Sequence, residues 1–432
     1  MGKGTVAQMT DKSESNPLEN MDPAIIRGLA MPRMTRRGFL GLAGAGMLGA
    51  IAAACGSSST STSTATGGSF SWATAKKAGV LDFANWPLYI DQNTVNGKTV
   101  YPTLQQFTKE TGIKVNYQEV IQGNSSFFGK IEPELKAGKS TGYDLMVITD
   151  GPVLTQLMMY GWLTPLDHSY LPNFAKYAGA NVKSPSYDPG NKYTLAWQSG
   201  FTGIGYNPEL TGGDITSLAS LFDPKFAGKV GMLAAVDTPN LVMIYQGVDP
   251  NKSGPSDWKK AAALMQDQKS KGIVRKYYQQ NYINALENGD IAISVAYSGD
   301  IYQANQSSKG ANLKFVVPSE GVFRWTDNMC IPAHSLHPVD AITYMNYVYN
   351  PRVAATMAEY IDYMTPVPSS KNYVIQDANA SSGSNKAGLL AMADSPLVYP
   401  TAADFAHAYY GPALDPTAYQ TWNSIFQPIF QS

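Results

Sequence analysis

The sequence predicts an α/β protein of two lobes, each a mixed sheet flanked by helices, with a ligand cleft between the lobes. Three observations lead to this prediction. Short apolar segments alternate with amphipathic segments from Gly79 onward, which is typical of sheets covered by helices. The chain has 432 residues, more than one hydrophobic core usually supports. A second set of strand and helix segments begins at Gly203, without an internal repeat.

The first set of elements follows from the spacing of apolar residues. Residues 80–84 form an apolar strand, and a helix around residues 104–108 ends at Gly112. Residues 113–117 alternate as a strand, the helix marked by residues 128, 131 and 135 ends near Gly138, and residues 144–148 form the next strand. This order of strands and helices predicts a parallel or mixed sheet.

The second set contains a strand at residues 230–233, a helix at 258–265 and a strand at 291–295. We expect residues 78–198 and 326–368 to form lobe 1, and residues 199–325 and 369–432 to form lobe 2. Ligands of such sheets bind beyond the carboxyl ends of the strands, so the expected site lies between the lobes.

The N-terminus carries an export pattern. Arg36 and Arg37 precede the apolar stretch 38–54, whose five glycines and short length make it a weak candidate for a membrane span. Three alanines then precede Cys55, as at lipoprotein cleavage sites. Residues 1–54 are therefore predicted to be a twin-arginine lipoprotein signal, with lipid attached to Cys55. We expect the protein to be lipid-anchored, in the periplasm or on the outer face of the cytoplasmic membrane.

Residues 55–75 are predicted to be a tether, because residues 56–68 are Ser, Thr, Gly and Ala and cannot build a core. Removal of residues 1–54 leaves 26 Lys and Arg against 29 Asp and Glu. This mild acidity argues against nucleic acid as a partner, since phosphate-binding surfaces need clustered positive charge. The other cysteine, Cys330, has no second thiol to pair with once Cys55 is acylated. We expect a monomer.

The sequence lacks the usual signatures of catalysis. It has four histidines and no HExxH, CxxC, GxSxG or GxxxxGK[ST] motif. His334 and His337 lie three residues apart, and Pro338 directly follows His337, so both are in a predicted loop. We therefore expect a binding protein, not an enzyme, with no cofactor and no metal.

Six segments, in order along the chain, resemble the spermidine/putrescine-binding proteins of bacterial ABC importers. They are NWPLYI at 85–90, TGIKV at 111–115, YDLMV at 143–147, AYSGD at 296–300, FRWTD at 323–327 and YMTP at 363–366. The resemblance implies a type II periplasmic binding protein fold, a polyamine ligand, and ABC transporter permease subunits as partners.

Carried over position by position, the resemblance implies a site of rings and acids. The ring-bearing contacts would be Trp86, Tyr89, Tyr297, Trp325 and Tyr363; the acids would be Asp300 and Asp327, with Thr149 as a hydroxyl and Asp237 near a further acid. Such a set suits a polyamine, because ammonium groups bind carboxylates and aromatic faces.

The chain departs from this family at several positions. Pro87 and Leu88 stand where spermidine-binding members can carry a hydroxyl and an acid, and Asp150-Gly151 replaces a hydroxyl and an aromatic residue. Arg324 adds a positive charge near the proposed site, which fits a cation ligand only if this side chain points outward. Two alternatives stay open: a receptor of the same fold for another small cation or an organophosphonate, and an exported hydrolase using Asp300 and Asp327 as paired carboxylates.

Overall fold

The computed structural model describes residues 70–279, 281–306 and 312–431. Ten of its strands form one mixed sheet, in the order β4-β1-β5-β11-β6-β9-β7-β8, with β10 beside β6 and β12 beside β11. These strands are β1 (Val80–Asn85), β4 (Lys114–Glu119), β5 (Leu145–Thr149), β6 (Thr194–Tyr206), β7 (Val230–Leu233), β8 (Val274–Tyr278), β9 (Ile293–Tyr297), β10 (Lys314–Val316), β11 (Val322–Cys330) and β12 (Ala408–Tyr409). A separate hairpin pairs β2 (Asn93–Val95) with β3 (Lys98–Val100).

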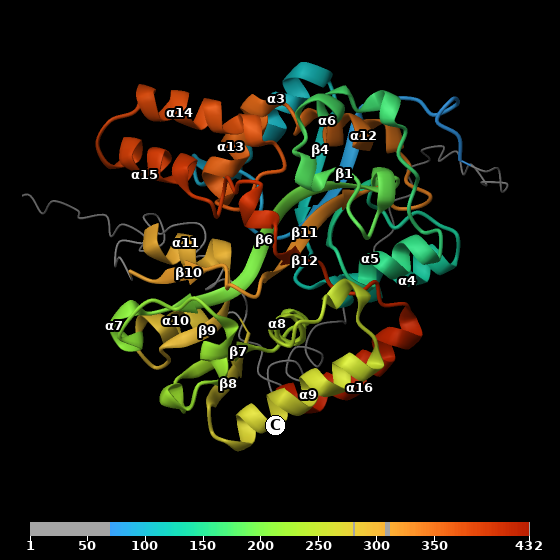
Figure 1. Cartoon of the computed structure of the whole chain (residues 1–432). Coiled ribbons are helices and arrows are strands. Elements are labelled where there is room, and N and C mark those ends of the chain that lie inside the picture. Colours follow the sequence, from blue (N-terminus) through green and yellow to red (C-terminus); the bar gives the residue numbers. More distant parts are fainter. Residues whose placement is uncertain (1–69, 280, 307–311, 432) are drawn as a thin grey trace, which may run out of the picture.

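The α-helices cover this sheet (Figure 1). They are α3 (Pro102–Thr111), α4 (Asn124–Lys136), α5 (Pro152–Met159), α6 (Pro172–Tyr177), α7 (Pro208–Thr211), α8 (Asp237–Tyr245), α9 (Pro255–Ser270), α10 (Tyr282–Glu287), α11 (Ser298–Gln306), α12 (Pro338–Tyr347), α13 (Pro351–Ile361), α14 (Lys371–Ala380), α15 (Gly383–Asp394) and α16 (Pro416–Gln431). The predicted α/β class is confirmed.

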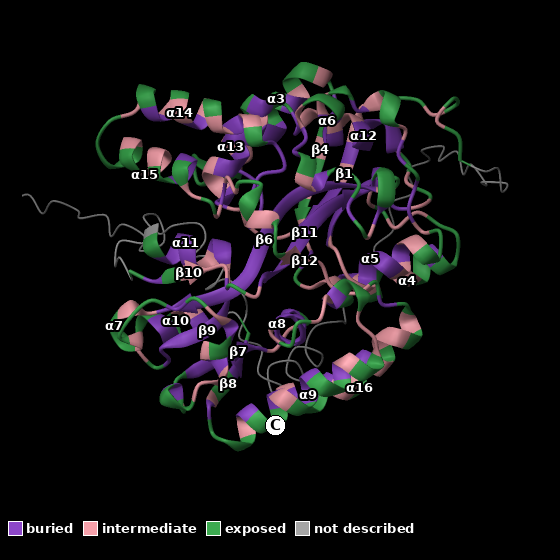
Figure 2. Cartoon of the chain, in the orientation of Figure 1, coloured by how far each residue is buried: buried purple, intermediate pink, exposed green. Residues whose placement is uncertain are grey.

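Strand β5 shows why the first half of the sheet is covered on both faces. Leu145 and Val147 enter a core with α3, α12 and α13, whereas Met146 and Ile148 enter a core with α4 and α5. Side chains alternate between the faces of a strand, so a strand buried on both faces is a continuous apolar run. Figure 2 shows the central strands β1, β6 and β11 as buried and the outer faces of the helices as largely exposed.

The second half of the sheet has a separate large core. It combines β7, β9 and β6 with α8, α9 and α16, and its central side chains include Met232, Trp258 and Trp422. The three parallel strands β9, β7 and β8 mirror the parallel set β4, β1 and β5. This arrangement of two cores confirms the predicted two-lobe α/β architecture.

The two lobes share one sheet because β6 and β11 run through both. β11 is hydrogen-bonded to β6 from Phe323 to Cys330, β5 pairs with the later part of β11, and β9 pairs with the later part of β6. The predicted lobe boundaries at residues 198 and 325 fall inside these two strands. The exact residues at which one lobe ends and the other begins therefore stay a prediction.

The C-terminal segment divides between the lobes. Residues 369–432 were expected to join lobe 2, and α16 does pack against α9 there. In contrast, α14 and α15 pack against Ala355 of α13, a lobe 1 helix, and against Tyr302 of α11. The apolar residues of these two helices therefore lie where both lobes contribute.

The start of the folded part lies inside the predicted tether. The indole N–H of Trp72 donates to the carbonyl of Pro165, and its ring lies 5.4 Å from that of Tyr170. Residues 1–69, including the predicted signal and Cys55, lie outside the described residues. No helix of the described part is long and apolar enough to span a membrane.

Candidate functional site

The carboxyl ends of the parallel strands of both lobes carry most of the predicted ligand residues. Trp86 and Tyr89 follow β1, Thr149 ends β5, and Tyr297 ends β9 directly before α11. Asp237 begins α8, which follows β7. Strand β11 passes between the two sets and presents Trp325 and Asp327 on one face, because they are two residues apart.

Asp327 binds two side chains of lobe 1. The Tyr89 hydroxyl donates to Oδ2 of Asp327, and the Thr149 hydroxyl donates to Oδ1, each at 2.6 Å. The amide of Asn124 in turn donates to the Thr149 hydroxyl at 2.9 Å. These bonds fix the carboxylate and orient Thr149, so the lobe 1 side of the site is ordered by the protein itself.

Asp237 and Asp300 lie at the N-termini of lobe 2 helices. The Thr202 hydroxyl donates to Asp237 at 2.7 Å, and the Tyr297 hydroxyl donates to its other oxygen at 3.5 Å. Asp300, in the first turn of α11, accepts from Tyr282 at 2.7 Å and from Tyr363 at 3.3 Å. Helix N-termini favour negative charge, so the carboxylate of each aspartate interacts favourably with the dipole of the helix that it begins.

Aromatic rings connect the three carboxylates into one network. Tyr363 lies 5.9 Å from Tyr89 and 5.6 Å from Trp325, and Trp325 lies 6.1 Å from Tyr297, all edge to face. We call Tyr89, Thr149, Asp237, Tyr297, Asp300, Trp325, Asp327 and Tyr363 the acid-aromatic cluster. The structure thus brings eight of the nine predicted ligand residues together.

Two glycines make room for the rings of this cluster. A Cβ atom on Gly200, which pairs with Trp325 across β6 and β11, would lie 2.2 Å from the Trp325 ring. A Cβ atom on Gly299 would lie 1.9 Å from the Tyr363 ring. Both rings therefore rest directly on backbone, and a side chain at either position would displace the ring above it.

Asp237 and Asp327 of the cluster lie in a poorly hydrated environment. Burial raises the pKa of Asp327, while the hydrogen bonds from Thr149 and Tyr89 act in the opposite direction. Burial likewise raises the pKa of Asp237, against the hydrogen bond from Thr202. Buried carboxylates of this kind favour a cationic ligand, because the positive charge of the ligand offsets the cost of burying the negative charge of the carboxylates.

Trp86 lies outside the contacts that connect the cluster. Its indole N–H donates to the carbonyl of Val147 at 3.0 Å, two residues before Thr149 on β5. Leu88, the departure from the family pattern, is buried and has a positive φ of 56°. Its backbone N–H donates to Glu119 at 3.3 Å, so an acid from β4 lies beside the position that lost one.

Sequence reasoning missed several contributors. Thr202 and Tyr282 bind the cluster acids from β6 and α10, and no motif marks them. Asp150 follows Thr149 directly and accepts a hydrogen bond from the backbone N–H of Thr326 at 2.5 Å. The sequence did contain a signal for Asp150. This acid directly follows β5, and residues just beyond the carboxyl end of a strand in such a sheet lie where ligands bind.

Arg324 points away from the acid-aromatic cluster, but into the protein and not into solvent. It is buried, donates to the carbonyl of Asn181 at 2.7 Å, and its guanidinium lies 4.7 and 4.8 Å from the ring centres of Phe405 and Tyr410. One position before Trp325, it faces the opposite side of β11. The physical reason is that two aromatic faces and a carbonyl solvate the guanidinium in place of water.

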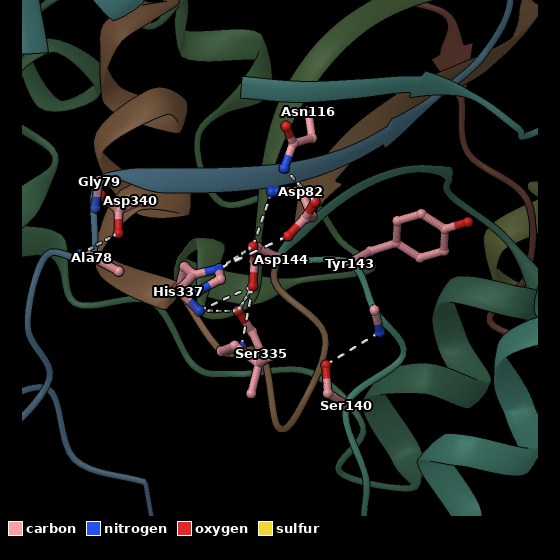
Figure 3. Close-up of polar contacts among 12 residues, drawn as sticks. Ala78, Gly79, Asp82, Asn116, Ser140, Tyr143, Asp144, Ser335, His337 and Asp340 are labelled. Carbon is pink, nitrogen blue, oxygen red and sulfur yellow. Dashed lines mark hydrogen bonds and ion pairs between the residues drawn. The ribbon is translucent and has the colours of Figure 1, made fainter. Parts of the chain in front are cut away.

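One group of described residues has the composition of a metal site. Asp82, Asp144 and His337 bring their ligand atoms within 4.8 Å of one another (Figure 3). The carboxylate of Asp144, however, already accepts from the backbone N–H groups of Asp82, Leu336 and His337, the Ser335 hydroxyl and the His337 ring. These donors satisfy both oxygens, so the group is a structural anchor that ties the loop before α12 to β1 and β5.

This anchor gives a prediction for stability. Asp144→Asn replaces an acceptor-only group by one that cannot serve all these donors, so we expect the free energy of unfolding to fall by about 2–4 kcal/mol. Asp144 precedes β5 and the site lies at the other end of that strand, so ligand affinity should be unchanged in the folded fraction. Urea unfolding followed by fluorescence measures the loss; an unaltered midpoint would contradict the anchor role.

Comparisons with known proteins identify the family of this chain. Residues 103–383 match the family of bacterial extracellular solute-binding proteins. The chain is 31% identical over 301 residues to the putrescine-binding periplasmic protein SpuD of Pseudomonas aeruginosa, covering 66% of this chain and 77% of that one. It is 28% identical over 366 residues to the putrescine-binding periplasmic protein PotF of Escherichia coli, covering 80% and 90%.

Solved structures share the fold. The spermidine/putrescine ABC transporter substrate-binding protein PotD of Streptococcus pneumoniae superposes with a TM-score of 0.67 at 22% identity, over 82% of this chain and 98% of that chain. The TpPotD lipoprotein of Treponema pallidum gives 0.64 at 17% identity, over 82% and 100%. With a family match over most of the folded part and a relative above 30% identity, the chain belongs to the bacterial extracellular solute-binding proteins.

Proposed function

We propose that this protein binds a polyamine, such as putrescine or spermidine, at the acid-aromatic cluster and delivers it to the permease of an ABC importer. The observation that carries the proposal is the connection of Asp237, Asp300 and Asp327 by a chain of aromatic rings at the junction of the two lobes. Relatives named for putrescine and spermidine binding support the ligand class.

The chemistry of the cluster matches that of a polyamine. Such a ligand is an alkyl chain with ammonium groups at intervals, and each ammonium needs oxygen acceptors. A charge-assisted hydrogen bond to a carboxylate contributes about 1.5–3 kcal/mol, and a cation on an aromatic face about 0.5–2 kcal/mol. The rings of Tyr363, Trp325 and Tyr297 offer apolar surface for the methylene groups between the acids.

The two-lobe architecture explains how binding would be coupled to transport. Asp327 with Thr149 belongs to the lobe 1 end of the sheet, whereas Asp237 and Asp300 start helices of lobe 2. A ligand that contacts both sets stabilises the closed arrangement, because only that arrangement offers all the contacts at once. A permease would then distinguish loaded from empty protein by the relative position of the lobes.

Export and membrane attachment complete the proposal. The twin-arginine pattern and Cys55 would deliver the protein across the membrane and leave it lipid-anchored, with residues 56–68 as tether. Cys55→Ala should release the protein from the membrane fraction while leaving ligand binding unchanged. Retention of this variant in washed membranes would contradict lipid attachment at Cys55.

Isothermal titration calorimetry on residues 70–432 tests the ligand. Putrescine, cadaverine, spermidine and spermine are titrated, with 1-aminobutane and γ-aminobutyrate as ligands that lack the second ammonium. We expect binding of at least one polyamine to be much tighter than that of both controls, because each control leaves a buried carboxylate unpaired. The absence of heat and of a thermal shift with all four polyamines would reject the proposal.

The organophosphonate alternative needs basic groups at the site. The N-termini of α8 and α11 point to the cluster but are met by Asp237 and Asp300, and Arg324 lies on the other face of β11. An aminoalkylphosphonate added to the titration series tests this alternative. The hydrolase alternative predicts turnover of a substrate, which a panel of chromogenic glycosides assayed with the same preparation would reveal.

A further inference from the structure

Asp150 lies beside the acid-aromatic cluster in a fixed position. Its backbone N–H donates to the carbonyl of Thr326 at 2.8 Å, and its Oδ1 accepts from the backbone N–H of the same residue at 2.5 Å. Thr326 stands between Trp325 and Asp327 on β11. Asp150 also follows Thr149, which binds Asp327. Two separate attachments thus hold this carboxyl group next to two members of the cluster.

The second oxygen of Asp150 is not engaged by the protein. Within the described residues, Oδ2 has no hydrogen-bond partner, and the residue is half-buried, so one oxygen is anchored and the other is left for a ligand group. The following residue, Gly151, has a φ of 130° and no atom within 4 Å of an ideal Cβ. A glycine here leaves open space beside the carboxyl group, where a larger side chain would stand.

The charges around Asp150 come from several elements. Asp327 and Arg324 of β11 and Asp237 of α8 act on it electrostatically, and the Tyr187 and Tyr410 hydroxyls lie close enough to be affected by its charge. Arg324 is a buried cation that is held by Asn181 and by two aromatic rings, without a carboxylate within ion-pair distance among the described residues. Its charge is therefore available to offset part of the negative charge of Asp150.

We propose that Asp150 is a further ligand-binding acid of this site, which contacts a ligand ammonium through Oδ2 and releases a proton when it does so. The inference rests on the proposed polyamine function and deepens it. It also offers a reason for the loss of an acid at Leu88. The chain lacks an acid after β1 but carries Asp150 at the carboxyl end of β5, the neighbouring strand of the same sheet.

The proton follows from the environment of the group. Burial raises the pKa of Asp150 to about 8, the negative charges of Asp327 and Asp237 add to this, and the Thr326 N–H and Arg324 act against it. At neutral pH the empty site therefore holds Asp150 mostly protonated. An ammonium at Oδ2 stabilises the carboxylate and lowers this pKa, so below pH 8 the O–H bond breaks and its proton goes to solvent as the ligand binds.

The direction of the pH effect can be worked out from this shift. Because binding releases a proton, affinity rises with pH up to about 8 and then levels, while the ligand ammonium groups keep their charge up to about pH 9. Each unit by which the ligand lowers the pKa of Asp150 contributes about a tenfold rise in affinity. Asp237 and Asp327 also contribute to the pH dependence of affinity. Because an Asp150 variant retains both of these acids, the difference between wild type and variant reports on Asp150.

The test compares wild type with Asp150→Asn from pH 6 to pH 8.5, using the polyamine that binds most tightly. Asparagine keeps an oxygen for the Thr326 N–H, so the fold should be retained. We expect equal affinities at pH 6 and an affinity of the variant about tenfold lower at pH 8.5. Calorimetry at pH 7.5 in phosphate and in Tris should show proton release for wild type and markedly less for the variant.

Two controls separate this role from a structural one. Glu132→Gln removes one charge from α4, where Glu132 pairs with Lys136, and should leave the affinity ratio near one at every pH. Arg324→Gln should move the rise in affinity to higher pH, because it removes the positive charge that lowers the pKa of Asp150.

The outcomes also separate this inference from the proposed function. A ratio of wild type to Asp150→Asn that does not change with pH, with no difference in proton release, overturns the role of Asp150 and leaves polyamine binding intact. Failure of wild type to bind any polyamine removes the proposed function, and the Asp150 inference with it.

Discussion

Asp327→Asn should weaken polyamine binding by about 30- to 1,000-fold, or roughly 2–4 kcal/mol. Asp327 is the acid that Tyr89 and Thr149 hold from both sides, so its position is fixed before a ligand arrives. Asparagine keeps the shape but removes the charge that pairs with an ammonium in a buried setting. Calorimetry at pH 7.5 measures the loss.

The stability of the same variant separates binding from folding. Burial raises the pKa of Asp327, so the folded protein favours the protonated form and the ionised group costs stability above that pKa. The unliganded variant should therefore melt at the same temperature as wild type or higher at pH 7. A lower melting temperature with unchanged affinity would show that Asp327 serves the fold instead of the ligand.

Gly299→Ala should reduce affinity by about 10- to 100-fold, or roughly 1.4–2.8 kcal/mol. The new methyl group would lie 1.9 Å from the Tyr363 ring, which must then move. Movement of that ring breaks its bond to Asp300 and its edge contacts with Tyr89 and Trp325. We also expect the free energy of unfolding to fall by about 1–3 kcal/mol, as in overpacked cores.

Gly388→Ala is the matched control for this substitution. Gly388 lies inside α15, and its ideal Cβ has no atom within 4 Å. Alanine there should raise the free energy of unfolding by about 0.5–1 kcal/mol, because a helical glycine is costly, and affinity should not change. If Gly299→Ala behaves like Gly388→Ala in both measurements, Tyr363 does not depend on Gly299 for its position.

Local patterns in the sequence were enough to predict β1, α3, β4, α4 and β5 of lobe 1. The apolar run at residues 144–148 becomes β5 with a shift of one residue, and Gly112 ends α3 with a φ of 74°. In helix α4 the predicted core residues Ile131 and Leu135 are buried, but Phe127 completes the buried stripe and Phe128 is half-buried against Trp162. A stripe spaced by three or four residues allows either phenylalanine, and only packing against β5 decides between them.

Strand β6 shows why the lobe connection could not be predicted. Its thirteen residues include Gly200, Gly203 and Gly205, and glycine inside a strand argues against the strand. Each of these glycines is close to another group: Gly200 to Trp325, Gly203 to the carbonyl of Val316, and Gly205 to Ala296. The reason for the glycines is thus a close approach by distant residues, which local sequence does not contain.

The sequence by itself determined the class of fold and the kinds of side chain at the site, because strand periodicity and the residues that follow each strand are local properties. Tertiary structure alone decided how these side chains combine. It placed Tyr363 between Asp300 and Tyr89, buried Arg324 between two rings, and brought Asp150 against β11 beside Asp327. Each of these contacts joins segments far apart in the chain, and their charges and distances depend on burial that only the folded sheet provides.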